Sequence, residues 1–237
     1  MKRLDVSWQA SSIWKSVTWH PCLVCLAVAA SLATACSQGV GEGSVKSDRL
    51  YIGNCWNGPF DLGPNFFGAI PFSKDVISIR VQRGDDNQEV SDGLNVMVND
   101  VQEIRSSAAA QDVDGGIGLG EDIEVGLPPG VTPPGMPIRL NEHPPVVSLT
   151  LYLQDTCHLH NGTIYSVSGT INFAKLFSGN ANETNSDDRL TQASFDATFA
   201  DPRDMNTDYT FDENVTSHVT GWFKFYFQRG QPAQPFP

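Results

Sequence analysis

A carboxylate, a thiol and two imidazoles lie within six residues near the middle of the chain, in the segment Asp155-Thr-Cys157-His158-Leu-His160. Such groups can act as nucleophile, base and orienting acid, or they can ligate a metal. In a strand, however, His158 and His160 share one face while Cys157 points to the other, and the C-x-x-C spacing of common structural zinc sites is missing. We therefore predict strand-end residues beside a disulfide rather than a catalytic or metal site.

Acidic loops are the second group of residues that could do chemistry. Asp112 and Asp114 begin a Gly-rich acidic segment with the composition of a calcium loop, but Ile123 stands where an EF-hand has its twelfth-position Glu. Segments 182–188 and 201–208 are also rich in oxygen ligands. We expect solvated surface loops at all three places, with calcium binding as the alternative, and we expect no other cofactor.

Sequence motifs of the common enzyme classes do not occur in the chain. There is no Gly-x-Ser-x-Gly elbow, P-loop, dinucleotide fingerprint or His-Glu-x-x-His pair. Catalytic groups can also converge from distant loops, so a secreted hydrolytic enzyme stays open as an alternative. The predicted function is non-enzymatic.

Aromatic side chains near the C-terminus point to binding. The alternation in residues 219–227 sends three Phe side chains toward a core and puts Trp222, Lys224 and Tyr226 on the opposite face. Such a face could stack on a sugar ring or receive another protein. The interpretation that we favour is that this face packs beneath a loop or a second sheet, and a binding platform is the alternative.

The elements that must position these residues are strands. Apolar and polar residues alternate with period two from Arg49 onward, between clusters of Gly, Pro, Asn and Asp. This alternation is typical of antiparallel sheets with one solvated face. We predict an all-β fold, an antiparallel β-sandwich of jelly-roll type, with a closed barrel as the alternative. The expected strands are residues 76–81, 94–101, 146–153, 162–173, 193–199 and 219–227.

Other segments set the predicted limits of this domain, which we expect to cover residues 49–230. Residues 106–145 are rich in Ala, Gly and Pro and predict a long surface excursion. A helix of at most two turns is predicted only at Phe173–Phe177. The Pro-rich tail 231–237 cannot extend a central strand, because Pro has no N–H donor.

The N-terminal segment has the three parts of an export signal. Lys2, Arg3 and Lys15 supply positive charge, residues 23–32 are uncharged and largely apolar, and Ala33-Thr-Ala35 presents small side chains before Cys36. The apolar run is too short for a transmembrane helix, which needs about 20 residues. We predict that residues 1–35 are a signal peptide, removed on export.

The segment ending at Cys36 resembles the lipobox of bacterial lipoproteins, with Ala33 in the place of the usual Leu. The chain as a whole resembles exported lipoproteins of Gram-negative bacteria in its Cys-Trp-Asn-Gly-Pro-Phe-Asp-Leu and Phe-Gln-Arg-Gly-Gln-Pro-Ala segments, a resemblance that implies no activity. It implies a lipid on Cys36 that holds the protein to a membrane, and Ser37 resembles the outer-membrane sorting pattern. Residues 36–48 are then expected to be a flexible tether. The alternative is an ordinary secreted protein.

Cysteine count favours the lipidated form. The chain has five Cys, and Cys22 and Cys25 leave with the signal peptide. If Cys36 carries a lipid, Cys55 and Cys157 are left as one pair, which an oxidising compartment favours as a disulfide. The predicted location is therefore the cell envelope.

Charge excludes one class of partner. Removing residues 1–35 takes away three basic residues and one acidic residue and leaves 12 Lys and Arg against 26 Asp and Glu, a net charge of −14. Such a surface repels nucleic acid, whose phosphates need clustered Lys and Arg. We predict a non-enzymatic envelope lipoprotein that binds or assembles through its β-domain, with an unidentified protein or carbohydrate as its partner. A carbohydrate-binding module is the alternative from a different functional class.

Overall fold

The computed structural model describes residues 41–84, 91–107, 119–132, 145–158, 162–178 and 189–227. These residues form one sheet of ten strands, in which all strand pairs are antiparallel. The strands are β1 Gly41–Ile52, β2 Trp56–Asp61, β3 Phe66–Pro71, β4 Ile77–Gln82, β5 Asp92–Val98, β6 Asp122–Glu124, β7 Val147–Leu153, β8 Thr163–Lys175, β9 Leu190–Ala200 and β10 Thr216–Tyr226, with the short helix α2 Val101–Ser107 after β5.

Strand order follows chain order over most of the sheet. The order is β2-β1-β10-β9-β8-β7-β5-β4-β3, with β6 paired to β8. Only four residues, 62–65, join β2 to β3 although these strands stand at opposite ends of the order. The Leu62 amide donates to the Val45 carbonyl at 3.0 Å, and the Asn65 amide donates to the Gln82 carbonyl at 3.0 Å. The two ends of the sheet therefore lie close together.

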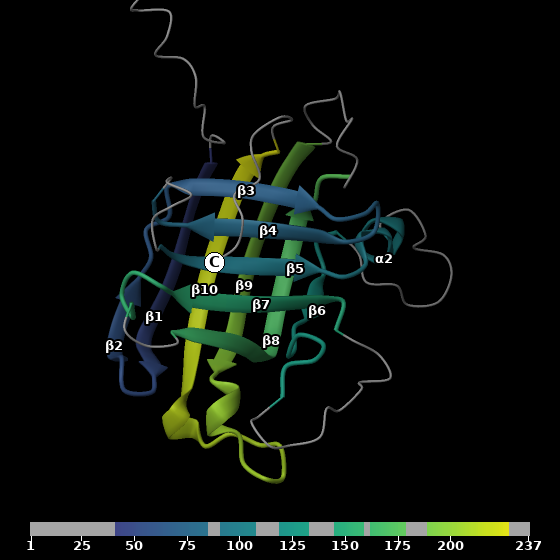
Figure 1. Cartoon of the computed structure of the whole chain (residues 1–237). Helices are drawn as coiled ribbons and strands as arrows, with labels where there is room; N and C mark the ends of the chain where they lie inside the picture. Colours follow the sequence, from purple (N-terminus) through teal and green to yellow (C-terminus); the bar gives the residue numbers. More distant parts are fainter. Residues whose placement is uncertain are drawn as a thin grey trace, which may run out of the picture. The chain divides into compact units, whose positions relative to one another are not determined.

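Strand β8 lets the sheet curl. Its residues 163–165 pair with β7, whereas residues 170–172 pair with β6. Between them the register to β9 shifts at Ser166/Ser168, and Gly169 has a φ of 116°, where a Cβ would overlap the Ala197 backbone. A bulge and a glycine of this kind bend a strand and increase its twist. Figure 1 shows β3, β4, β5 and β7 crossing steeply over β1, β10 and β9, so that the sheet forms a half-barrel.

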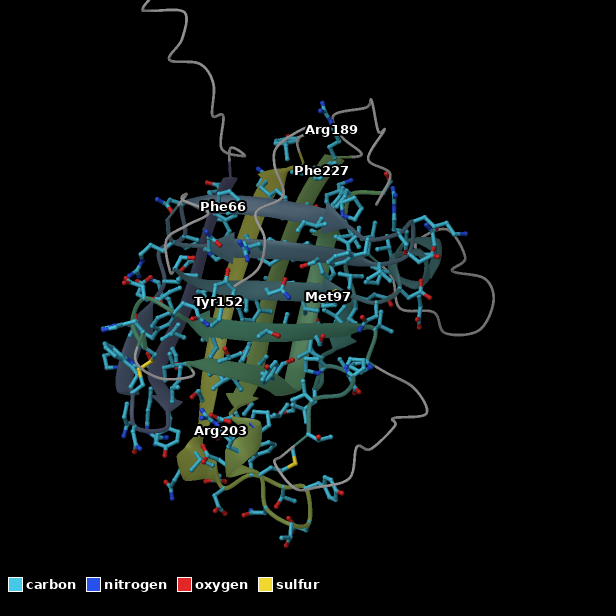
Figure 2. The ribbon with its side chains drawn as sticks, in the orientation of Figure 1. Phe66, Met97, Tyr152, Arg189, Arg203 and Phe227 are labelled. Carbon is cyan, nitrogen blue, oxygen red and sulfur yellow. A yellow bond between two sulfur atoms is a disulfide. The ribbon has the colours of Figure 1, made fainter. Side chains whose placement is uncertain are left out.

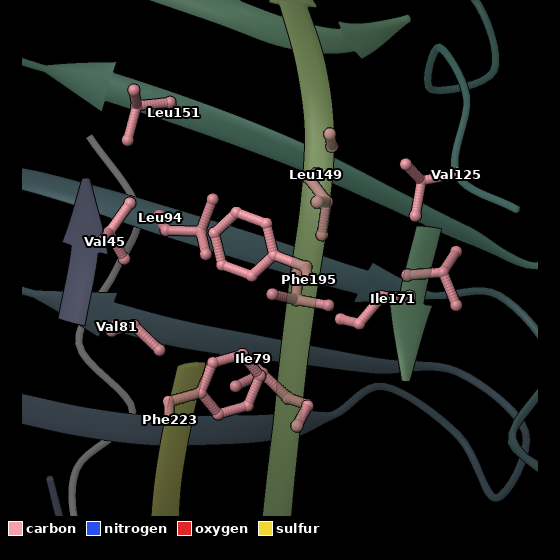
Figure 3. Close-up of a cluster of buried hydrophobic side chains, with 14 of the residues drawn as sticks. Val45, Ile79, Val81, Leu94, Val125, Leu149, Leu151, Ile171, Phe195 and Phe223 are labelled. Carbon is pink, nitrogen blue, oxygen red and sulfur yellow. The ribbon is translucent and has the colours of Figure 1, made fainter. Parts of the chain in front are cut away.

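The concave side of the half-barrel is the hydrophobic core. Alternate residues of every long strand point into it, as period-two patterning requires. Each fully buried side chain of this kind contributes about 1.5–3 kcal/mol relative to the exposed state. Side chains from strands far apart in the order meet there, including Ile79, Leu94, Leu149, Ile171, Phe195 and Phe223 (Figure 3).

The all-β prediction is confirmed, and its arrangement is corrected. One continuous antiparallel sheet stands where we predicted two packed sheets, and its meander order differs from the predicted jelly-roll connectivity. The physical reason is that alternation reports only which side chains are buried. It does not distinguish an opposing second sheet from the other half of the same curled sheet.

Two local predictions were wrong. The predicted tether 36–48 is wrong for residues 41–48, because β1 begins at Gly41 and pairs with β10 from its first residue; residues 36–40 lie outside the described residues. Gly41 serves packing there, since a Cβ would lie 2.6 Å from the Phe67 ring. The predicted helix Phe173–Phe177 is absent: β8 continues through Lys175, where it still pairs with β9, and residues 176 and 177 have no regular structure.

The predicted excursion at 106–145 contains some regular structure. Helix α2 extends to Ser107, and β6 pairs with residues 170–172 of β8. The remaining parts of the excursion that the structure describes are residues 119–121, 125–132 and 145. The predicted signal peptide 1–35 and the tail 231–237 lie outside the described residues. In the described ranges, no helix is both long enough and apolar enough to span a membrane.

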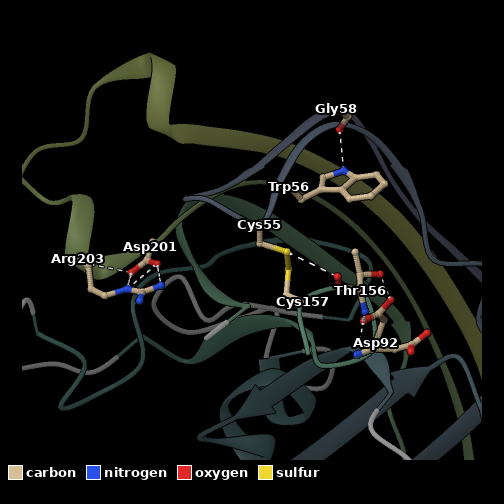
Figure 4. Close-up of a disulfide and its surroundings, with 9 residues drawn as sticks. Cys55, Trp56, Gly58, Asp92, Thr156, Cys157, Asp201 and Arg203 are labelled. Carbon is tan, nitrogen blue, oxygen red and sulfur yellow. Dashed lines mark hydrogen bonds and ion pairs between the residues drawn. A yellow bond between two sulfur atoms is a disulfide. The ribbon is translucent and has the colours of Figure 1, made fainter. Parts of the chain in front are cut away.

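The predicted disulfide joins Cys55 and Cys157, whose Cα atoms are 5.7 Å apart. It connects the turn between β1 and β2 to the turn after β7 (Figure 4). The bond therefore joins the two layers of the half-barrel, one that contains β1 and one that contains β7. Disulfides of this kind persist in oxidising compartments. The bond therefore indicates an extracytoplasmic protein.

Candidate binding face

Strand β10 carries the three residues predicted to form a binding platform. Its inward residues Phe223 and Phe225 are buried, whereas Trp222 is 44% exposed and Tyr226 is 42% exposed. Lys224 lies between the two aromatic residues and is half-buried. The structure thus brings all three side chains to one side of one strand. The prediction that we favoured from the sequence, that this side is buried, was wrong.

We call the side of β1, β10, β9 and β8 that points away from the core the outer face. Registers between the strands define its rows: Trp222 lies between Ser44 of β1 and Ser194 of β9, and Ser194 pairs onward with Asn172 of β8. These neighbours are short and polar. The indole ring therefore projects above a surface of hydroxyl and amide groups. Further members of the outer face are Glu42, Lys46, Thr170, Gln192, Asp196, Thr198, His218, Thr220, Lys224 and Tyr226.

Charged groups on the outer face are balanced locally. The His218 Nε2 atom lies 2.6 Å from an Asp196 carboxylate oxygen, and both side chains are about two-thirds exposed, at 65% and 67%. At the strand edge, Lys46 Nζ lies 3.1 Å from the carboxylate of Asp61. Exposed pairs of this kind add little stability. They leave the outer face with polar groups of both signs rather than a strongly charged patch.

The outward side of β4, β5 and β7 is different, because most of its polar side chains are buried. Tyr152 lies across Gly93 of β5 and donates from its hydroxyl to the Gln82 side-chain carbonyl at 3.1 Å. The Arg80 guanidinium lies 5.9 Å from the Tyr152 ring centroid. Burial raises the pKa of Tyr152 to about 12, an effect that the Arg80 charge reduces and the Asp92 charge increases. Figure 2 labels Tyr152 and Met97 on this part of the sheet.

Residues 155–158 lie beside the disulfide as predicted, but in a turn after the end of β7 rather than in the strand. The buried carboxylate of Asp92 accepts hydrogen bonds from the backbone amides of Asp155 at 3.1 Å and Thr156 at 3.0 Å, and from the Thr156 hydroxyl at 2.5 Å. These bonds hold the turn that presents Cys157 to Cys55 (Figure 4). The importance of Asp92 was not visible in the sequence, because its partners lie more than sixty residues away.

The acidic loop after β9 has a structural role. Asp201 is buried, accepts from the Arg203 amide at the start of a 3₁₀ turn, and forms an ion pair with the Arg203 guanidinium. The hydrogen bonds that the Arg203 guanidinium donates to Asp201 raise the pKa of Arg203. Burial, and then the Asp201 charge, raise the pKa of Asp204 and likewise that of Tyr165.

Metal ligation was the alternative for these loops. Among the described residues, no group of three or more His, Cys, Asp or Glu side chains is arranged to hold a metal ion. The calcium candidates Asp112 and Asp114 lie outside the described residues, as do the predicted lipidation site Cys36 and His160. Calcium binding at Asp112 and Asp114 and the lipid on Cys36 therefore stay predictions.

Sequence reasoning missed a pocket at the other end of the outer face. It lies between β8, β9 and the loop that precedes β10, and its lining includes Tyr209 and Phe211. The only available signal was a pair of aromatic residues in a largely polar loop, 201–215, which period-two analysis does not interpret. None of the protein-family models, curated proteins or solved structures with which we compared the chain matches it.

Proposed function

We propose that this protein is a non-enzymatic, lipid-anchored protein of the cell envelope that binds carbohydrate through its outer face. The observation that carries the proposal is the exposure of Trp222 and Tyr226 on the same side of β10, on either side of Lys224. Large aromatic side chains are ordinarily buried, so two of them exposed on one strand favour a surface with a ligand.

Spacing and surroundings favour a sugar polymer as that ligand. Trp222 and Tyr226 are four residues apart on one strand, a separation of about 13 Å at 3.3 Å per residue. Between and beside them lie hydroxyl, amide and charged groups, including Ser194, Gln192 and Lys224. Aromatic rings offer apolar faces to the C–H surface of a sugar ring, and the polar neighbours can bond to its hydroxyl groups.

Two features support the proposed location in the cell envelope. The disulfide is consistent with export, and the lipobox-like segment ending at Cys36 provides the lipid attachment that would hold the domain at the outer membrane. Mass spectrometry of the mature N-terminus tests this part. We expect a diacylglycerol thioether on Cys36, and an unmodified N-terminus in membrane-free culture fluid would instead support the secreted form.

Binding can be tested with a panel of neutral soluble polysaccharides in affinity electrophoresis. We expect at least one polysaccharide to retard the protein, and Trp222→Ala and Tyr226→Ala each to weaken that retardation about tenfold, as for loss of an aromatic hot spot. Phe72→Ala is the matched control, because Phe72 is 60% exposed but follows β3, away from the outer face. Equal retardation of all four proteins would exclude the outer face as the binding site.

A further inference from the structure

The pocket at the end of the outer face has room for a sugar ring. It has a volume of about 430 Å³ and is open to solvent. Its apolar lining comes from Leu127 and Val167, and Tyr209 and Phe211 add half-buried aromatic rings. Ligand pockets usually fall between about 300 and 1,000 Å³, so this pocket is at the small end of that range.

Polar groups line the same pocket. Ser168 of β8, Thr198 of β9 and Thr216 of β10 contribute hydroxyl groups, and Glu213 contributes a carboxylate. Hydroxyl groups both donate and accept hydrogen bonds, whereas a carboxylate only accepts. This set complements a ligand that carries several hydroxyl groups. The carboxylate and the chain's net charge of −12 disfavour an anionic ligand.

The turn that presents Tyr209 is held in a conformation that a tyrosine rarely adopts. Tyr209 has a φ of 68°, in the left-handed region, which costs on the order of 1–3 kcal/mol for a residue other than Gly. The turn is closed by hydrogen bonds from the Asn206 amide to the Thr210 carbonyl at 2.8 Å and from the Tyr209 amide to the Asn206 carbonyl at 3.0 Å.

A side chain in the same turn adds to this closure. The Asp208 carboxylate accepts from the Thr210 hydroxyl at 2.6 Å and from its amide at 3.1 Å, and these bonds, the hydroxyl's first, lower the pKa of Asp208. The turn thus fixes the Tyr209 backbone at the pocket although Asn or Gly would fit the same φ without that cost. Retaining a strained Tyr is explained if its ring has a function in the pocket.

Pocket and aromatic platform lie on one side of the same strands. Thr216 precedes Trp222 by six residues on β10, which is about 20 Å along the strand. His218 and Thr220 are exposed between them. A ligand chain that ends in the pocket can therefore continue along β10 to Trp222 over polar groups.

We infer that this pocket is the subsite for the terminal ring of a neutral glycan, whose following rings extend along β10 to Trp222 and Tyr226. The inference rests on the proposed carbohydrate binding and names the position of the chain end. It requires that single neutral sugars bind the pocket alone. It also requires that oligomers bind more tightly than single sugars, because they contact both places.

The test uses the purified protein with D-glucose, D-galactose, N-acetyl-D-glucosamine and their oligomers, measured by saturation-transfer NMR and calorimetry. We expect Tyr209→Asn to abolish binding of the single sugars and to weaken binding of the oligomers about tenfold. We expect Trp222→Ala to weaken only the oligomers. Thr207→Ala is the control, since Thr207 is an exposed residue of the same turn that does not line the pocket.

The stability of Tyr209→Asn separates a binding role from a structural one. Asn tolerates the left-handed conformation, so relief of strain predicts a melting temperature equal to that of the wild type or about 2 °C higher. A drop of more than about 5 °C would show that Tyr209 is retained for packing and would overturn the inference.

Binding outcomes distinguish the two proposals. Tyr209→Asn with unchanged affinity for every sugar would overturn the pocket as a subsite, while a simultaneous loss in Trp222→Ala would leave the proposed function standing. If the wild type binds none of these sugars and no polysaccharide, both proposals fail.

Discussion

On the outward side of β7, Ser148 and Tyr152 are buried, whereas Ser194 and Asp196 on the outward side of β9 are exposed. Both strands have the same alternation of apolar and polar residues. On the β7 side, Tyr152 lies across Gly93 of β5, and its hydroxyl bonds to the Gln82 side chain. One half of the half-barrel thus buries outward polar groups such as Tyr152 and Gln82, which bond to each other, and the other half leaves its outward polar groups exposed to a ligand.

The largest expected effect comes from the bond that joins the two regions. Cys55→Ser with Cys157→Ser opens a loop of 102 residues, and the chain-entropy estimate is a loss of about 4–5 kcal/mol in the free energy of unfolding. Urea denaturation of the wild type with and without reductant measures the same quantity. A loss below about 1 kcal/mol would mean that the two layers hold together without the bond.

An added methyl group tests whether the outward side of β4, β5 and β7 is closely packed. In Gly93→Ala the new Cβ would lie 2.7 Å from the Gln82 Cβ and would also overlap the Tyr152 hydroxyl, so we expect a destabilisation of about 1–3 kcal/mol. Gly58→Ala in β2 is the control, because nothing lies within 4 Å of the place that its new methyl group would occupy. Equal stabilities of the two variants in chemical denaturation would contradict the packing of Tyr152 across Gly93.

Alkaline pH should lower the stability of the protein through Tyr152, on the outward side of β7. Because burial raises the pKa of Tyr152 from 10.0 to about 12, the folded protein keeps a proton that the unfolded chain has already lost. This contribution is complete below about pH 10 and is lost as the pH rises toward 12, at roughly 1.4 kcal/mol per pH unit. In urea titrations between about pH 9 and 11.5, Tyr152→Phe should show a shallower decline than the wild type. An identical decline would argue that Tyr152 is accessible to solvent.

The smallest expected effect on stability comes from a substitution on the outer face. Trp222→Ala should change the free energy of unfolding by no more than about 0.5 kcal/mol, because Trp222 is 44% exposed between short polar neighbours. The same substitution is expected to weaken polysaccharide binding about tenfold and to leave the binding of single sugars unchanged. A loss of about 2 kcal/mol or more in thermal or chemical unfolding would assign Trp222 to packing rather than to a ligand.

Period-two patterning predicted most strands but not their mutual arrangement. The segments at 146–153, 162–173, 193–199 and 219–227 are all strands, because alternation is a local property of the chain. The β8 bend at Gly169 and the start of β1 at Gly41 were not predicted. Both depend on backbones or rings that approach from elsewhere, Ala197 in one case and Phe67 in the other.

The sequence predicted which residues of the candidate site share a face, but not whether that face is exposed. Trp222, Lys224 and Tyr226 share a face because their spacing requires it, whereas their exposure depends on what covers that face in the folded protein. The pocket with Tyr209 was missed, because it requires the loop before β10 to lie beside β8 and Leu127, which are distant in sequence.

The sequence by itself determined the strand character of the chain, the side of each strand that is apolar, and the Cys55–Cys157 pair as the candidate disulfide. These properties follow from residue type and from spacings of two residues, and from a count of cysteines. Only the tertiary structure decided that one sheet curls on itself, that Tyr152 is buried, and that Trp222 is exposed. Those outcomes depend on which strands pass over one another, and no spacing along the chain encodes that directly.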